Sequence, residues 1–522
     1  MGFPFARHEP TDFLSSPPHE YARYDVKHWW EEAFFYHIYP LGFCDAPGEN
    51  DFHSDPEDRL IRIEEALPSV EAVGCNALYL GPVFESSTHG YDTADYYAVD
   101  RRLGDEAALR RLVDAAHARG IRVILDGVFH HVGRDFPAFR RLRETGEEAG
   151  SAAAEASWFR GVDFSSDNRY GDGFVYHAWE GNEELVALDL ANPEVVNHLL
   201  GAVEWMMRDL AVDGLRLDVA YLLPPAFMQK LRSHTDRVAA ELGTEDFWLM
   251  GEAIHGDYTE LVAADRLHSA TNYECYKGLW SSHNDGNYFE IAHSLSRQFA
   301  PGGIYEGMLL YNFADNHDVD RVASILEDSG HLFPLYALLM TMPGIPSVYY
   351  GSEFAARGSR RGGSDAELRP AWSRVDKSET RLRNYLAELA AIRRDYPALR
   401  TGSYRELHVA HTSLAFERGA AQGVAAEGTA AEDGAGKGGG GNGGGGNGGA
   451  GRLVVAVNAA SESAEVELPL GGAGAAAGTS DAAGAGAAAL ASLFEPGRRF
   501  TVSDGAATVT VPAYGCEILR VE

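Results

Sequence analysis

Between about residues 30 and 400, short apolar runs alternate with stretches of helical periodicity, and this alternation limits the fold more than any other feature. The apolar runs occupy residues 34–43, 77–84, 122–129, 214–220, 247–254, 269–276, 307–318 and 345–353. Continuous apolar runs are typical of parallel strands that are buried on both faces. Eight such strands with helices between them predict a closed (β/α)₈ barrel, the TIM barrel of the α/β class.

The stretch 105–120 illustrates the helical pattern. Apolar residues recur there at i, i+3, i+4 and i+7 between Leu109 and Ala116, as expected for one buried helix face. Asp105 is placed to cap the first turn and Gly120 to end the helix. The pattern therefore predicts a helix that packs against the barrel.

One connection is too long for a simple crossover. About sixty residues separate the third strand from the helical stretch 192–211, in which Asn192 and Pro193 form a helix start of cap followed by first-turn proline. Residues 132–191 are therefore expected to form an inserted subdomain over the strand ends, where barrel active sites are built.

After about residue 400 the pattern changes to alternating strands, such as 412–418, 452–460 and 463–470, which predict an antiparallel β-sandwich. Two low-complexity stretches, 419–451 and 471–488, are expected to be hairpin loops without a binding role. The predicted plan is an N-terminal extension (1–28), a barrel (29–131 and 192–400), the insert (132–191) and the sandwich (401–522).

The charge balance restricts the partners. The chain has 44 basic and 77 acidic residues, a net charge of −33, which opposes binding to nucleic acid, anionic membranes and phosphorylated substrates. No run is long and apolar enough for a membrane helix. The N-terminal residues lack a signal-peptide pattern, and the four cysteines form no CxxC pair. These features predict a cytoplasmic protein.

Charged residues recur at the predicted strand ends, where a barrel interior would otherwise be apolar. They are Asp126, His131, Arg216, Asp218, Glu252, His317 and Asp318. A single carboxylate of this kind could be a structural ion pair or a loop anchor. Because the carboxyl ends of all barrel strands open on one mouth, the whole set is expected to form a site.

The set suits the cleavage of a glycosidic bond with retention. That reaction needs a nucleophilic carboxylate and a carboxylic acid about 5 to 5.5 Å apart, and adjacent strands lie roughly 4.8 Å apart. Arg216 is expected to keep Asp218 ionised and oriented, whereas Glu252 needs a raised pKa to hold its proton. Asp318 can stabilise the positive charge that develops on the sugar.

Four motifs now identify a resemblance: DGVFHH (126–131), GLRLDVA (214–220), GEAIH (251–255) and NHD (316–318). In this order they resemble the α-amylase family of glycoside hydrolases, in its neopullulanase, cyclomaltodextrinase and maltodextrin-degrading branch. The resemblance implies that Asp218 is the nucleophile, Glu252 the general acid and base, and Asp318 the stabiliser of the transition state.

The resemblance also implies sugar-binding residues. Tyr91 matches an aromatic platform under the cleaved glucose, and Asp92 and Arg369 match a pair that closes this subsite. Further sugar contacts are implied at Asp365, His131, Arg216 and His317. The alternatives are a rim-packing tyrosine, buried structural histidines and a solvated loop around Asp365. Trp179 in the insert either stacks on substrate or packs internally.

The sequence departs from the family at its calcium site. His130 stands where many members have asparagine, and Tyr221 and Leu222 stand where lysine and histidine are common. Because calcium prefers oxygen ligands, we expect no calcium site, and no other metal or cofactor is implied.

The predicted function is hydrolysis of α-1,4-glucosidic bonds in soluble maltooligosaccharides. An Asp92–Arg369 wall, the absence of an export signal and His255, which resembles intracellular family members, favour short substrates. A transglycosylase or isomerase on the same scaffold stays open because it shares the covalent intermediate. A non-catalytic carbohydrate-binding or transporter-subunit relative is the alternative of another class. Linkage preference and oligomeric state are left open.

Overall fold

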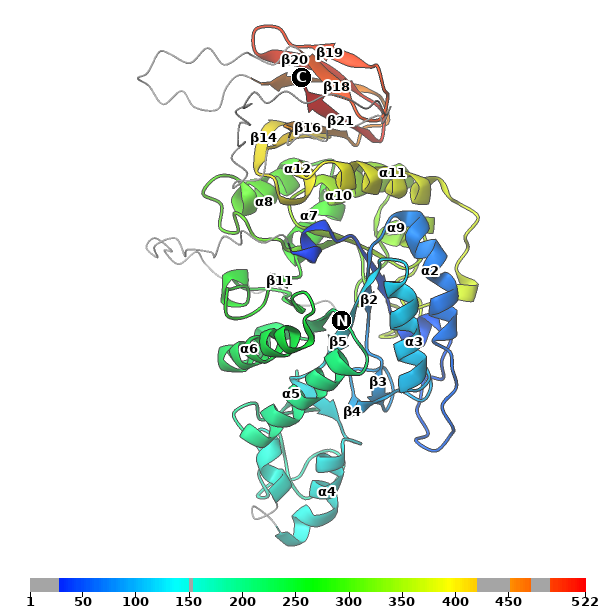
Figure 1. Ribbon diagram of the computed structural model, residues 1–522, viewed down its shortest axis with the longest axis vertical. Helices are drawn as coiled ribbons and strands as arrows, with labels where there is room; N and C mark the ends of the chain where they lie inside the picture. The colour runs from blue at the N-terminus through cyan, green and yellow to red at the C-terminus, as the bar shows by residue number, and fades with distance from the viewer. Residues whose placement is uncertain (1–27, 150–153, 420–450, 471–488) are drawn as a thin grey trace, which may run out of the picture.

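The computed structural model describes residues 28–149, 154–419, 451–470 and 489–522 (Figure 1). Residues 1–27, 150–153, 420–450 and 471–488 lie outside this description. The expectations for the N-terminal extension and for the two low-complexity loops therefore stay predictions.

The core of the protein is a barrel of parallel strands in chain order. The strands are β1 (Phe35–Ile38), β2 (Ala77–Leu80), β5 (Arg122–Gly127), β9 (Gly214–Leu217), β10 (Trp248–Gly251), β11 (Ser269–Ala270), β12 (Tyr311–Phe313) and β13 (Ile345–Tyr349). β1 pairs in parallel with both β2 and β13. A parallel bridge between Thr271 and Tyr311 joins the two remaining edges and closes the barrel. The predicted (β/α)₈ barrel is confirmed.

Apolar side chains from alternating positions fill the barrel. Phe35 stacks on Trp248 with ring centroids 5.1 Å apart, and both side chains are fully buried. Tyr311 contacts Phe35 edge to face, and Trp30 packs against the same cluster from the helical turn η1 (Trp29–Glu32). The barrel interior is thus a packed core, which leaves the strand ends as the place for a site.

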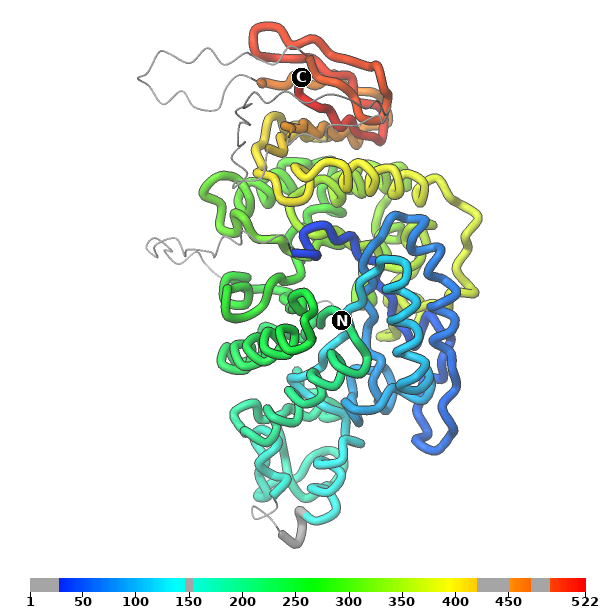
Figure 2. Tube along the Cα trace, in the orientation of Figure 1, coloured from blue at the N-terminus to red at the C-terminus, as the bar shows by residue number. Residues whose placement is uncertain are grey.

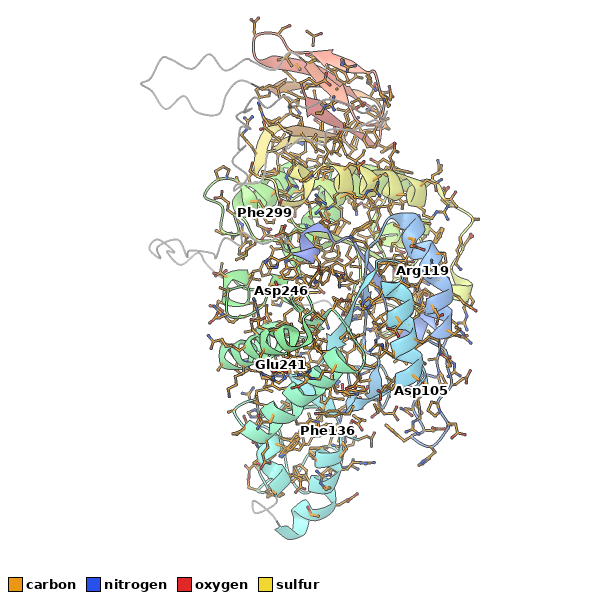
Figure 3. The ribbon with its side chains drawn as sticks, in the orientation of Figure 1. Asp105, Arg119, Phe136, Glu241, Asp246 and Phe299 are labelled. Atoms are coloured by element: carbon orange, nitrogen blue, oxygen red, sulfur yellow. The ribbon has the colours of Figure 1, made fainter. Side chains whose placement is uncertain are left out.

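Helices surround the strands (Figure 1). They are α1 (Pro40–Phe43), α2 (Ile61–Val73), α3 (Glu106–His117), α5 (Pro193–Arg208), α6 (Pro225–Leu242), α7 (Tyr273–Asn284), α8 (Phe289–Phe299), α9 (Val322–Ile325), α10 (Leu332–Thr341), α11 (Arg381–Asp395) and α12 (Ala398–Thr401). Asp105, labelled in Figure 3, caps α3 by accepting the N–H of Ala108. Asn192 caps α5 in the same way, so both predicted helix starts are confirmed.

The sixth strand is shorter than predicted. The run 269–276 was expected to be one strand, but β11 ends at Ala270 and α7 begins at Tyr273. The physical reason is Asn272, whose side chain accepts the N–H of Cys275 and so starts a helix within the apolar run. Between β10 and β11 the chain forms only the helical turn η5 (Tyr258–Glu260), where a barrel normally has a helix.

The insert after β5 is a small separate layer at one end of the molecule (Figure 1). Its sheet has the order β6 (His131–Gly133), β8 (Asn182–Ala187) and β7 (Ala178–Trp179), accompanied by α4 (Pro137–Ala149) and η3 (Ala154–Trp158). β4 (Thr93–Val99), which pairs with β3 (Phe84–Ser86), contacts β6. The insert therefore begins at the carboxyl end of β5, beside the predicted site.

The C-terminal part forms antiparallel sheets at the opposite end of the molecule (Figure 2). Six strands follow the order β14 (Tyr404–Val409), β15 (Ser413–Arg418), β16 (Leu453–Asn458), β21 (Gly515–Val521), β18 (Ala489–Ser492) and β19 (Arg499–Thr501). The pair β17 (Ala464–Pro469) and β20 (Ala506–Val511) shares an apolar core with them. This arrangement confirms the predicted sandwich. Helix α10 packs against β16 and β21.

Within the described residues, no helix is both long and apolar enough to span a membrane.

Candidate active site

The carboxyl ends of β5, β9 and β10 bring four charged side chains together. Asp126 lies opposite Arg216 in the β5–β9 ladder, and Asp218 and Glu252 directly follow β9 and β10. Each of the four is at most 6% exposed. Their burial at adjacent strand ends means that their charges interact strongly.

Arg216 is the centre of this group. Its Nη1 lies 2.9 Å from Oδ1 of Asp126 and 2.8 Å from Oδ1 of Asp218, and its Nη2 lies 2.9 Å from Oε1 of Glu252. One guanidinium thus contacts three carboxyl groups. Three ionised carboxylates around one guanidinium would leave an excess of negative charge in a buried place. The arrangement therefore favours a state in which one of the three carboxyl groups keeps its proton.

The pKa values of the two outer carboxyl groups follow from this balance. Burial raises the pKa of Asp218 above its ordinary value, Arg216 opposes the rise, and the nearby Glu252 adds to it. Burial likewise raises the pKa of Glu252, as expected from the sequence, with Arg216 again opposing. The expectation that Arg216 keeps Asp218 ionised did not take into account that the guanidinium is shared among three carboxyl groups.

Glu252 is also held by a strained turn. Val219, directly after Asp218, has φ 40° and ψ 45°, a left-handed conformation that is rare for a β-branched residue. Its N–H donates to Oε2 of Glu252 at 2.8 Å. Strain of this kind costs about 1–3 kcal/mol and is found mainly where a functional geometry requires it. The turn fixes the carboxyl group of Glu252 relative to Asp218.

Asp318 lies across the mouth, between the ring of His317 and the guanidinium of Arg369. Its Oδ2 is 2.8 Å from Nε2 of His317, and its Oδ1 is 3.0 Å from Nη2 of Arg369. Burial alone would raise the pKa of Asp318, but His317 and Arg369 outweigh it, so this pKa lies below its ordinary value. Asp318 therefore carries a negative charge over the whole physiological pH range.

Asp92 and Arg369 do not form the expected pair. Arg369 contacts Asp318 and also Asp365, whose Oδ2 lies 3.1 Å from its Nη2. Asp92 instead accepts hydrogen bonds from the Thr88 hydroxyl at 2.7 Å and from the N–H of Gly90 at 3.2 Å. Among the described residues, Asp92 and Arg369 therefore form no ion pair with each other. The guanidinium of Arg369 is bound by Asp318 and Asp365, and the carboxylate of Asp92 is bound by the turn that contains Thr88 and Gly90.

Tyr91 lies at the mouth beside the charged cluster. Its ring stacks on His317 with centroids 5.5 Å apart and an interplanar angle of 7°, and its hydroxyl also contacts the His317 ring. The same hydroxyl donates to Oδ2 of Asp126 at 3.0 Å. Tyr91 is partly exposed. Its position is compatible with an aromatic platform.

His131 lies next to the other side of Asp218, with its Nε2 3.8 Å from Oδ2. Burial and the neighbouring His130 lower the pKa of His131 to about 3, so the ring is neutral at ordinary pH. Its buried Nε2 has no hydrogen-bond partner within the described residues. Trp179 of the insert lies 6.1 Å from the His131 ring. Neutral His131 thus retains a polar atom that a sugar hydroxyl could use.

The residues at the family's calcium positions have other surroundings. His130 contacts His131, and burial together with Arg160 lowers its pKa to about 4. Tyr221 lies 6.4 Å from the ring of His255, and Leu222 is exposed. Across the described ranges, no cluster of three or more His, Cys, Asp or Glu side chains is arranged to hold a metal ion. The lack of a calcium requirement stays a prediction.

The sequence reasoning left part of the site undescribed. Asp126 was counted among the charged strand-end residues but was given no role, yet it accepts hydrogen bonds from Arg216, Tyr91 and Tyr79. Tyr273, at the start of α7, receives a hydrogen bond from Asn316 at 3.2 Å. Asn316 also accepts the N–H of Asp318. The contact of Asp126 with Arg216 could have been predicted, because both residues stand at the ends of adjacent strands. Tyr273 was missed because the run 269–276 was predicted to be a strand, whereas α7 begins there.

Comparisons with known proteins agree with this geometry. A sequence model described as "Alpha amylase, catalytic domain" matches residues 37–402. Neopullulanase 2 of Thermoactinomyces vulgaris is 31% identical over 428 residues, covering 78% of this chain and 70% of the relative. A cyclomaltodextrinase of a Bacillus species is 28% identical over 428 residues, covering 76% and 74%.

A solved structure shows the same architecture. The ligand-free form of cyclic α-maltosyl-(1→6)-maltose hydrolase from Arthrobacter globiformis superposes with a TM-score of 0.70 at 25% identity, covering 95% of this chain and 100% of that chain. The sequence match extends over the barrel strands that carry Asp218, Glu252 and Asp318. The chain therefore belongs to the α-amylase family of glycoside hydrolases, of the neopullulanase and cyclomaltodextrinase type.

Proposed function

We propose that the protein is a retaining α-glycosidase that hydrolyses α-1,4-glucosidic bonds in soluble maltooligosaccharides. The observation that carries this proposal is the position of Arg216, which contacts Asp218 through Nη1 and Glu252 through Nη2. Retaining enzymes need carboxyl groups about 5–5.5 Å apart, whereas inverting enzymes need about 6.5–9.5 Å. Two carboxyl groups on adjacent strand ends, bound to one guanidinium, favour the shorter separation.

In the first step, Asp218 attacks the anomeric carbon of the cleaved glucose. Its Oδ1 is bound to Arg216, so Oδ2, on the side of His131, is the atom available for attack. Glu252 gives its proton to the glycosidic oxygen as the bond from that oxygen to the anomeric carbon breaks. The products are a glycosyl ester of Asp218, the shortened sugar and ionised Glu252.

In the second step, Glu252 takes a proton from water, and the resulting hydroxide oxygen bonds to the anomeric carbon. Asp218 leaves as a carboxylate and Glu252 is protonated again, so protons balance over the cycle. The raised pKa of Glu252 suits this alternation, because a carboxyl group that is more basic than usual keeps its proton for the first step and accepts one more readily in the second.

The remaining residues bind the glucose unit that is attacked. Asp318, whose pKa His317 and Arg369 hold below its ordinary value, stabilises positive charge on the sugar ring in the transition state. Tyr91 offers its ring face, and His131 and His317 offer ring nitrogens to sugar hydroxyls. Arg369 orients Asp318 and links it to Asp365.

One structural argument for short substrates is not supported by the contacts of Asp92 and Arg369. Asp92 and Arg369 were expected to pair and so close the subsite, but they form no ion pair with each other. A limit on the length of the substrate therefore has to rest on other features. Arg369, Asp365 and Arg360 form a charged rim instead, with Nε of Arg360 2.6 Å from Oδ1 of Asp365. The name of one relative, a cyclomaltodextrinase, supports cyclic maltodextrins as substrates, and that of the other, a neopullulanase, supports pullulan.

The setting of the enzyme is also a proposal. The free cysteines Cys44, Cys75, Cys275 and Cys516 are buried, which supports a reducing compartment such as the cytoplasm. The excess of acidic residues supports a neutral oligosaccharide as partner, without nucleic acid or membrane.

The stereochemistry of the first product tests the mechanism. Proton NMR of maltotriose hydrolysis should show the α-anomer of the new reducing end before mutarotation, because two displacements restore the configuration. Initial formation of the β-anomer would exclude the covalent intermediate. Products from maltotriose to maltohexaose, pullulan and soluble starch, followed over time, test linkage and length. Early long fragments from starch would contradict the preference for short substrates, and transfer products would identify a transglycosylase.

A further inference from the structure

Beyond the end of β10, a single side chain holds the backbone of Ala253. The hydroxyl oxygen of Thr271 accepts the N–H of Ala253 at 2.8 Å and donates to the carbonyl oxygen of the same residue at 3.2 Å. β10 ends at Gly251, so these two groups lie past the strand ladder. Ala253 is fully buried and Thr271 is 6% exposed. The hydroxyl thus takes the place of a neighbouring strand.

Thr271 is itself fixed by the barrel. Its N–H donates to the carbonyl oxygen of Gly251 at 3.0 Å, and its backbone forms the bridge to Tyr311 that closes the barrel. The position of the hydroxyl is therefore set by backbone contacts on both sides.

Ala253 directly follows Glu252, so the contact acts on the acid. The N–H of Glu252 donates to the carbonyl oxygen of Leu217 at 2.9 Å, which ties one side of the residue to β9. Thr271 ties the other side through Ala253. The carboxyl group is then directed by Arg216 and Val219. Glu252 is held at its backbone from both neighbouring strands.

We infer that Thr271 is a positioning residue for Glu252, which fixes the direction in which the acid presents its proton to the glycosidic oxygen. The inference rests on the proposed function, because it needs Glu252 to act as the acid. Proton transfer depends on placing donor and acceptor within hydrogen-bond distance. A displacement of about 1 Å can lower a rate by about 100-fold.

Two substitutions separate the hydroxyl from the rest of the side chain. Thr271→Val keeps the shape and removes both hydrogen bonds, whereas Thr271→Ser keeps the hydroxyl. The substrates are maltotriose, whose leaving group needs a proton, and α-maltosyl fluoride, whose fluoride leaves with little help. Thr271→Val should lower kcat/KM for maltotriose by about 10- to 100-fold, mainly through kcat. The loss on the fluoride should stay within about threefold, and Thr271→Ser should recover most activity on maltotriose.

Thr235→Val is the matched control. Thr235 is fully buried in α6, and its hydroxyl donates to the carbonyl oxygen of Arg232 at 3.0 Å. This variant should leave the ratio of the two kcat/KM values unchanged. Circular dichroism and melting temperature are measured for all variants. If Thr271→Val does not fold, Thr271→Ala is judged by the same ratio.

Equal losses on both substrates, or unchanged hydrolysis of maltotriose by a folded Thr271→Val protein, would overturn the inference. Glu252→Gln separates that result from a failure of the proposed function. If Glu252→Gln loses maltotriose hydrolysis selectively while Thr271→Val does not, only the role of Thr271 is wrong. If Glu252→Gln shows no dependence on the leaving group, Glu252 is not the acid, and both proposals fall.

Discussion

The hydroxyl of Tyr350 donates a hydrogen bond to the carbonyl oxygen of Pro370, 2.7 Å away. Its neighbour Tyr349 donates to the carbonyl oxygen of Leu368 at 3.1 Å. The carbonyl groups on both sides of Arg369 are therefore tied to the carboxyl end of β13. Arg369 reaches Asp318 from a backbone that the barrel holds in place.

Removal of the Tyr350 hydroxyl should weaken this support. We expect Tyr350→Phe to lower kcat/KM for maltotriose by about 2- to 12-fold, which corresponds to one hydrogen bond of about 0.5–1.5 kcal/mol. Tyr336→Phe is the control, because the Tyr336 hydroxyl is buried and has no hydrogen-bond partner among the described residues. Equal effects of the two substitutions would show that the contact with Pro370 does not matter.

Replacement of the proposed nucleophile should nearly abolish turnover. Asp218→Asn should lower kcat by roughly 10⁴-fold, because the amide cannot form the glycosyl ester. Calorimetric binding of maltotriose should change little, since the sugar contacts remain. Asp265→Asn, at an exposed carboxylate, controls for the loss of charge. Near-normal turnover of Asp218→Asn would refute the proposed mechanism.

The stability of the protein should depend on pH through Glu353, which lies in the helical turn η7 (Ser352–Phe354) that follows β13. Its Oε1 accepts the hydroxyl of Tyr36, and its Oε2 lacks a partner in the described structure. Burial raises the pKa of Glu353 from 4.5 to about 7. The folded state therefore holds a proton that the unfolded state releases above pH 4.5, and stability falls as pH rises from about 4.5 to 7.

Glu353→Gln should remove this pH dependence. The difference in pKa corresponds to about 3 kcal/mol at neutral pH, so the variant should unfold at a higher urea concentration than the wild type above pH 7. Glu71→Gln, which alters a surface pair with Arg119, should follow the wild-type curve. A Glu353→Gln protein with the same slope between pH 4.5 and 7 would assign the dependence to another group.

Chelation should have little effect. Since His130 and Leu222 replace the family's calcium ligands, prolonged dialysis against EDTA should leave both activity and melting temperature nearly unchanged. A fall of several degrees that added calcium reverses would reveal a site in this protein.

The stretch 420–450 should be dispensable. β15 and β16 pair up to Arg418 and Leu453, so a short turn can join Gly419 to Gly451 without disturbing the register. Loop closure depends weakly on length, and the shorter loop should add about 1–2 kcal/mol of stability. Activity on maltotriose should be unchanged. A weaker affinity for oligosaccharides would assign a binding role to this stretch.

The fold could be predicted where local signals and burial agree. Asp105 and Asn192 cap the helices that their sequences indicate, and apolar runs mark the barrel strands. The prediction failed at 269–276 because Asn272 starts a helix inside an apolar run, and periodicity alone cannot detect a side-chain cap.

The charged group at the strand ends could be predicted because parallel strands place their carboxyl ends together. The ion-pair partners of its arginines could not be predicted. Whether Arg369 binds Asp92 or Asp318 depends on competing contacts between segments far apart in sequence. The pKa of Asp218 depends on how many carboxyl groups share Arg216, and that number is fixed only by the folded barrel.

The barrel should open first between β11 and β12, because β11 has only two residues and a single bridge, from Thr271 to Tyr311, joins these strands. Amide hydrogens between these two strands should exchange with solvent sooner than those of β5 or β9, because fewer ladder contacts protect them. An opening there releases Ala253 together with Thr271 and so displaces Glu252 before the barrel unfolds. On heating, catalytic activity should disappear several degrees below the loss of far-UV circular dichroism.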